Sequence, residues 1–87
     1  MSNFDDKHTR TMLFNVEKAK RQKIEEILKS VYASLEEKEY NAVNQLVGYI
    51  LSGDPSYITS YKDARNSIKE IERDELLEEL IKSFMEK

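Results

Sequence analysis

The sequence predicts a small all-helical domain, and three observations indicate this fold class. Apolar residues recur at three- and four-residue steps along most of the chain, which is the period of amphipathic helices. No segment alternates apolar and polar residues as a strand does, and no internal repeat occurs. The chain has 87 residues, 39% hydrophobic and 36% charged, which suits one core with a strongly hydrated surface. We therefore expect a bundle of about four to five helices with short connections.

The first stretch is predicted to be a flexible N-terminal tail. Residues 1–16 follow neither a helical nor a strand period, and the polar cluster from Asn3 to Thr11 is interrupted only by Phe4. We place the boundary between this tail, which carries the phosphoacceptor candidates, and a helical dimerisation and partner-binding domain of residues 17–87.

Two long helices come next. The first is expected from about Glu17 to Lys38, with one apolar face made of Ile24, Ile27, Leu28, Val31 and Leu35. The second starts at the cap residue Asn41 and stops at Gly53, which adopts the left-handed conformation easily. It is the most apolar segment and carries Val43, Leu46, Val47, Ile50 and Leu51.

The remaining elements are shorter. Asp54 followed by Pro55 predicts a cap and a brief helical turn, after which Thr59 or Ser60 can cap a third helix. The apolar positions of this third helix are Ala64, Ile68 and Ile71, and those of the fourth are Leu76, Leu77, Leu80, Ile81 and Phe84. A break near Arg73 and Asp74 separates the two in this interpretation.

The tyrosines and the second helix carry more apolar surface than a short bundle easily hides. Packing in the core accounts for most of these side chains, and the alternative for the remainder is a surface shared by two copies. We predict a homodimer and place Leu46, Tyr49 and Ile50 at its interface.

The charge pattern indicates a local basic surface. Lys62, Arg65, Lys69 and Arg73 follow one another at three- and four-residue spacing, so they should share one helical face. The common reading of such a stripe is a solvated face with ion pairs. The functional reading is that these four residues dock an acidic or phosphorylated partner.

Other signals argue against catalysis, metals and membranes. The chain lacks cysteine, its one histidine (His8) lies in the expected tail, and no glycine-rich phosphate loop is present. We expect no catalytic residue, no metal and no cofactor, and no membrane insertion because no apolar run approaches about 20 residues. The protein is expected in the cytoplasm. A net charge of -3 argues against nucleic acid, although a DNA-binding bundle that uses the Lys62 to Arg73 helix is the alternative function.

Two threonines, Thr9 and Thr11, lie in the segment HTRTMLF of the expected tail. An extended chain can enter a kinase cleft, so both are candidate phosphorylation sites. The alternative is that Thr11 and the apolar residues after it only pack the tail onto the bundle.

The stretch YNAVNQLVGYILSGDPSYI, followed by KDARNSI and ERDELLEELIKSF, resembles the IreB family of small bacterial regulators, and TMLFN matches the family's phosphoacceptor motif. The resemblance implies a helical homodimer from bacteria of the Firmicutes type. It also implies phosphorylation by a membrane Ser/Thr kinase with PASTA modules, removal of the phosphate by a cognate phosphatase, and control of cell-wall synthesis and of tolerance to envelope stress or antibiotics. In some members the unphosphorylated protein promotes proteolysis, by the Clp machinery, of the first committed enzyme of peptidoglycan synthesis.

Carried over by position, the family's phosphoacceptor falls on Thr11, with Thr9 as a second site where relatives usually have an acidic residue. The family's basic segment matches Lys62, Arg65 and Arg73. Glu39 and Ala42 stand where a glycine and a proline are common, so we expect a longer first helix or a stiffer link. Our hypothesis is that phosphate on Thr11 masks the basic stripe or repels an acidic surface.

Overall fold

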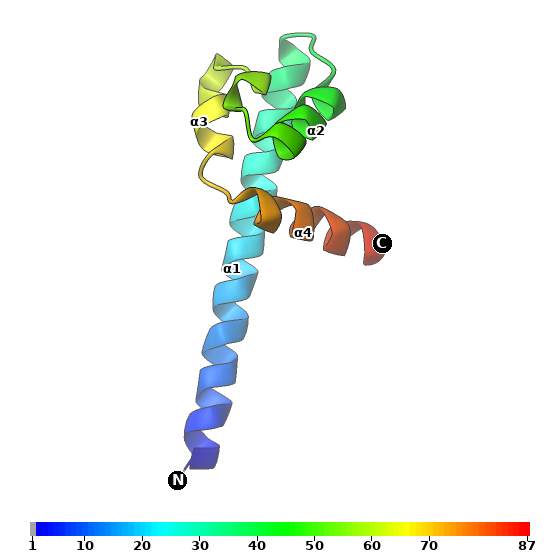
Figure 1. The fold of residues 1–87 in the computed structure, drawn as a ribbon. Coiled ribbons are helices and arrows are strands. Elements are labelled where there is room, and N and C mark those ends of the chain that lie inside the picture. Colours follow the sequence, from blue (N-terminus) through cyan, green and yellow to red (C-terminus); the bar gives the residue numbers. More distant parts are fainter. Residues whose placement is uncertain (1) are drawn as a thin grey trace.

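The computed structural model describes the backbone of residues 2–87 and the side chains of residues 15–87. In that part the chain forms helices only: α1 (Ser2–Glu37), α2 (Ala42–Ser52), α3 (Ala64–Ile68) and α4 (Arg73–Met85), with the 3-10 turns η1 (Pro55–Tyr57) and η2 (Tyr61–Asp63). The all-helical class and the expected number of helices are confirmed. The molecule measures 57 × 25 × 21 Å, and α2 and α3 pack about the C-terminal half of α1 (Figure 1).

The start of α1 differs from the expectation. The helix begins at Ser2 and not near Glu17, so the backbone of the expected tail is helical here, and this half of α1 stands clear of the other helices (Figure 1). Residues 2–16 contain neither glycine nor proline, and Asp5 and Asp6 near the N-terminus complement the helix dipole. No local signal therefore ends the helix earlier. The mobility of residues 1–16 stays a prediction.

The end of α1 is a C-terminal cap built on Glu39. The amide of Tyr40 donates to the carbonyl of Leu35, and the amide of Glu39 donates to that of Glu36, which is the bonding pattern of a Schellman motif. This motif needs a left-handed residue, and Glu39 supplies it with φ 63°. The motif ends α1 at Glu37 and places a side chain where glycine is favoured, and the expectation of a longer first helix or a stiffer link stays a prediction.

Glu39→Gly is expected to raise the free energy of unfolding by about 0.5–1 kcal/mol, because the left-handed conformation costs a residue with a Cβ more than it costs glycine. Urea denaturation followed by circular dichroism measures the change. Glu36→Gly is the matched control inside the helix, and it should lose about 1 kcal/mol. A loss of stability in both variants would contradict the role given to Glu39.

The caps predicted around α2 and η1 are confirmed. The Asn41 side chain accepts from the amide of Asn44, and Gly53 ends α2 with φ 74° and its amide bonded to the carbonyl of Tyr49. Asp54 accepts from the amide of Ser56 at the start of η1, and Thr59 accepts from that of Tyr61. These short-range bonds turn the chain back toward α1.

The core lies where α1, α2 and α3 meet. Its largest fully buried side chains are Leu35, Ile58, Ile68, Leu76 and Val31. The expected apolar face of α1 is confirmed at Ile24, Val31 and Leu35, and Ile71 is buried although it lies outside any helix. On α4 only the first of the five expected apolar positions, Leu76, is buried. The later apolar residues of α4 are exposed.

Candidate functional site

The four basic residues predicted to form a stripe do not share one helical face. Lys62 lies in η2 with φ 52°, α3 ends at Ile68, and Arg73 begins α4 after a break. The spacing of the charges fits a helix, but the backbone leaves the helical conformation twice within the segment. The single-face geometry is therefore wrong. A five-residue α3 also does not provide the recognition helix that the DNA-binding alternative requires.

Two of these basic residues serve the chain's own fold. Arg65 Nε donates to the carbonyl of Ile58 at 2.8 Å, and one guanidinium nitrogen of Arg73 donates to the carbonyl of Ile50 at 2.8 Å. The Arg73 guanidinium also lies against Gly53, where an added Cβ would come within 2.8 Å of it. Arg73 thus caps the C-terminal end of α2 although it is exposed, and Arg65 is the only one of the four that is partly buried.

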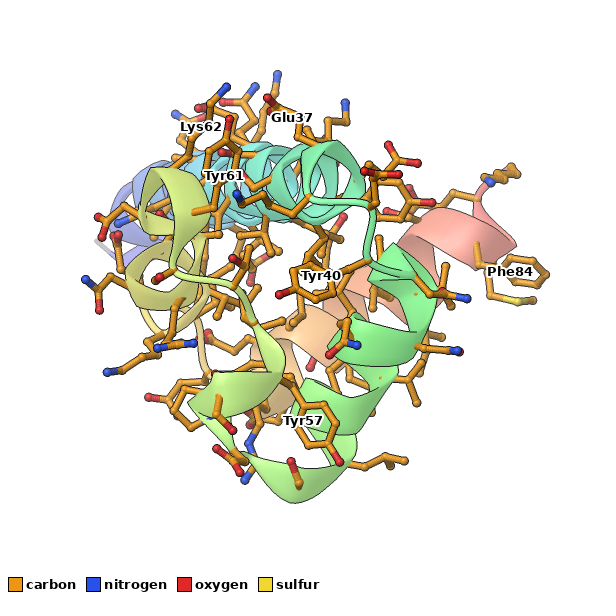
Figure 2. The ribbon with its side chains drawn as sticks, turned by 90° about the horizontal axis from the view of Figure 1, so that it is seen from above. Glu37, Tyr40, Tyr57, Tyr61, Lys62 and Phe84 are labelled. Atoms are coloured by element: carbon orange, nitrogen blue, oxygen red, sulfur yellow. The ribbon has the colours of Figure 1, made fainter. Side chains whose placement is uncertain are left out.

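Lys62 belongs to a polar cluster that includes residues not singled out in the sequence. Its ammonium donates to both carboxylate oxygens of Glu37 at 3.2 and 3.1 Å, and the Tyr61 hydroxyl donates to the same carboxylate at 3.2 Å. The ammonium groups of Lys38 and Lys62 lie 4.9 and 5.5 Å from the centroid of the Tyr61 ring. Figure 2 shows Glu37, Tyr61 and Lys62 close together at one edge of the molecule. We call these four residues the Tyr61 cluster.

Electrostatics and backbone geometry both act on the Tyr61 cluster. The hydrogen bond from Lys62 holds the pKa of Glu37 below its usual value, and the same bond raises the pKa of Lys62. Lys62 and Asp63 have φ of 52° and 61°, a left-handed conformation that costs about 1–2 kcal/mol for each residue with a Cβ. The cluster therefore sits on a strained turn. Strained turns are enriched at functional sites.

The residues expected at a dimer interface are largely covered by their own chain. Leu46 and Tyr49 are 9% and 5% exposed and belong to the core, while Ile50 is half-buried against it. Leu46 and Tyr49 were assigned to a dimer interface because the apolar pattern of α2 does not show which side of the helix faces α1. Val43, Val47 and Leu51 of the same helix are 56%, 47% and 79% exposed. They form the outward face of α2.

This outward face borders an apolar groove. A hollow of about 240 Å³ lies between α1, α2 and α4, and only apolar side chains or tyrosine line it, among them Leu28, Tyr32, Val47 and Leu80. The exposed apolar residues of α4 continue from it along the helix: Leu77, Ile81, Phe84 and Met85. Phe84 points away from the body of the molecule (Figure 2). We call this surface, from Val43 to Phe84, the apolar face.

Ion pairs join α4 to α1, and sequence reasoning did not find them. Arg21 Nε bonds Glu79 at 2.8 Å, and another of its nitrogens bonds Glu86 at 3.1 Å. Lys20 pairs with Glu75 on the same side. Glu79 is only 4% exposed, and its second oxygen accepts from the Ser83 hydroxyl at 2.9 Å. A buried charge with both oxygens bonded holds α4 across α1.

Burial tends to raise the pKa of Glu79, but the bonds from Arg21 and Ser83 outweigh it and leave the pKa below its usual value. A carboxylate with a lowered folded-state pKa stabilises the fold above its unfolded pKa of about 4.3, and this stabilisation is lost as the pH falls toward the folded value. We expect the stability difference between the wild type and Glu79→Gln to shrink from pH 7 to pH 3 in urea titrations. A constant difference would contradict this assignment.

The candidate phosphorylation sites lie in the first half of α1. The side chains of Thr9 and Thr11 are outside the described residues, so their roles stay predictions.

Among residues 15–87 no group of three or more metal-ligating side chains occurs. No helix of the described chain is long and apolar enough to cross a membrane. The arrangement as a whole is that of a small helical protein with exposed charged and apolar surfaces.

Comparison with known proteins specifies the class further. The family model described as IreB regulatory phosphoprotein matches residues 9–86. A protein named UPF0297 protein from Acetivibrio thermocellus is 60% identical over 76 residues, which cover 87% of this chain and 84% of that protein. Another of the same name, from Ruminiclostridium cellulolyticum, is 57% identical over 76 residues, which cover 87% and 86%. The chain belongs to the IreB family of regulatory phosphoproteins.

Proposed function

We propose that this protein is a non-enzymatic cytoplasmic regulator, switched by phosphorylation of Thr11 by a PASTA-type membrane Ser/Thr kinase and reset by a cognate phosphatase. The observation that carries this proposal is the family match, which begins at Thr9 and so includes both candidate threonines. The regulated process is cell-wall synthesis. The output is Clp-dependent proteolysis of the enzyme that commits UDP-N-acetylglucosamine to peptidoglycan, which the unphosphorylated form promotes.

The length of α1 separates Thr11 from Lys62, one of the four residues of the basic stripe. Thr11 and Glu37 lie on one continuous helix, so they are separated by about 39 Å along its axis at 1.5 Å per residue. Lys62 bonds Glu37 at the far end. A phosphate on Thr11 therefore does not reach Lys62 of the same chain in this conformation. Its charge of about -1.5 to -2 acts by repelling an acidic surface of the partner that approaches α1.

We also propose that the protein is a homodimer, and the apolar face supports this. A second copy offers the same groove and the same exposed α4, so a two-fold arrangement can place the Phe84 end of each α4 against the groove of the other chain. An exposed apolar surface that continues over two helices is typical of an interface. The dimer contact thus moves from Leu46 and Tyr49 to the outward side of α2 and to α4.

Binding measurements on three forms test the switch. Wild type, Thr11→Ala and kinase-phosphorylated protein are titrated by calorimetry with the purified peptidoglycan enzyme and with the Clp chaperone. We expect the first two to bind one of these proteins alike and the phosphorylated form to bind at least about tenfold more weakly, which corresponds to about 1.4 kcal/mol. Equal affinities for all three forms would reject phosphate as the switch.

A further inference from the structure

We propose that the Tyr61 cluster is an anion-binding centre that Glu37 keeps closed, and that an acidic segment of a partner protein displaces Glu37 from Lys62. The inference rests on the proposed function in one respect, namely that the protein acts by binding a partner protein. The inference adds the chemistry of the partner, an acidic segment, and it assigns to Glu37 the role of lowering the affinity of Lys62 for that segment. Glu37 acts in this account as an internal substitute for the partner's carboxylate.

The geometry of the cluster supports a binding role. Two ammonium groups from different elements, Lys38 after α1 and Lys62 in η2, approach the ring of the same tyrosine. Only Lys62 has a carboxylate partner within the described part of the chain, so the ammonium group of Lys38 lies beside the ring without an ion pair. In an extended acidic segment successive side chains point to opposite sides, so every second carboxylate lies on the same side, about 7 Å further along. This spacing allows one segment to contact both lysines. Such a site suits an acidic peptide.

The contact with Glu37 is weak enough to be exchanged. The side chains of Lys62 and Glu37 are 57% and 45% exposed, so water screens their attraction. The left-handed backbone at Lys62 and Asp63 directs the lysine to this position. The chain thus maintains a strained turn for an ion pair that adds little stability on the surface. This combination is explained if Lys62 is held for a partner and Glu37 covers it in the partner's absence.

An acidic protein segment fits better than a nucleic acid. The chain has a net charge of -3, and Arg65 and Arg73 are bonded to backbone carbonyls of their own chain. Nucleic acid requires a broad basic surface that neutralises many phosphates. A centre with two lysines and an aromatic ring matches a few carboxylates.

The test uses the full chain and an acetylated hexaglutamate peptide as the probe, titrated at low ionic strength. Glu37→Gln is compared with Glu36→Gln, which changes the net charge equally, and Glu36 forms no ion pair with the described side chains. We expect Glu37→Gln to bind the peptide about two- to fivefold more tightly than the control does. Adding Lys62→Ala to Glu37→Gln should remove this gain. Circular dichroism confirms that each variant keeps its helices.

Three results would overturn the inference: no binding of the peptide by any form, equal affinity of the two glutamine variants, or a gain that survives Lys62→Ala. An equal gain for an oligothymidine of the same charge would reject the acidic-protein assignment. These outcomes are independent of Thr11. If phosphorylation of Thr11 has no effect on partner binding but Glu37→Gln still binds the peptide more tightly, the proposed regulation is rejected and the binding centre stays. If phosphorylation acts as proposed but Glu37→Gln brings no gain, the binding centre alone is rejected.

Discussion

Leu35→Ala is expected to lower the free energy of unfolding by about 2–5 kcal/mol, because it removes buried methyl groups and leaves a cavity that the core fills only in part. Leu35 is 0% exposed and lies in the cluster formed by α1, α2 and α3. A folded domain of this size has only a small reserve of stability. We therefore expect a large part of the variant to be unfolded at about 37 °C. Circular dichroism measures the unfolded fraction, and a urea titration measures the free energy of unfolding.

The matched control is Leu51→Ala, which makes the same chemical change at a position that is 79% exposed. It should alter the free energy of unfolding of the monomer by less than about 0.5 kcal/mol. If both variants lose the same stability in dilute solution, the core does not lie where α1, α2 and α3 meet.

Val47→Glu is expected to convert the proposed homodimer to a monomer at micromolar concentration. Val47 is half-exposed on the outward side of α2 and lines the apolar groove, so a second copy would bury the new carboxylate without a partner. Removing an unpaired charge from water costs several kcal/mol, which weakens the association by about 100-fold or more. Sedimentation velocity over a concentration series measures the change, and circular dichroism shows whether the monomer keeps its fold.

Asn66→Glu adds the same charge at an exposed position of α3, which does not line the groove, and should leave the proposed homodimer intact. A dimeric Val47→Glu variant would exclude the apolar face as the interface. A monomeric wild type would reject the homodimer itself.

Local chemistry allowed the sequence to predict the helices and their caps. Asn41 and Gly53 bond to residues three or four positions away, so the sequence contains everything that places α2. The break between the third and fourth helices was expected near Arg73 and Asp74, but α3 already ends at Ile68 and α4 begins at Arg73. Ala64, Ile68 and Ile71 keep a helical spacing and are all buried, although the helix ends at Ile68. Spacing reports which side chains face the core, and it does not report whether the backbone between them remains helical.

The site was less predictable because its contacts join distant segments. Glu37 and Lys62 are 25 residues apart, and Arg73 bonds a carbonyl 23 residues earlier. No spacing rule connects such positions, so Arg73 was assigned to a partner although it caps α2.

The proposed regulation depends most on phosphorylation of Thr11. The direct measurement is mass spectrometry of the N-terminal peptide from protein isolated from its native cells with the phosphatase inhibited. We predict a phosphate on Thr11, increasing under cell-wall stress, and no such modification in cells that lack the kinase. A complete peptide that stays unmodified at Thr11 under cell-wall stress would contradict the account and leave a constitutive binding protein.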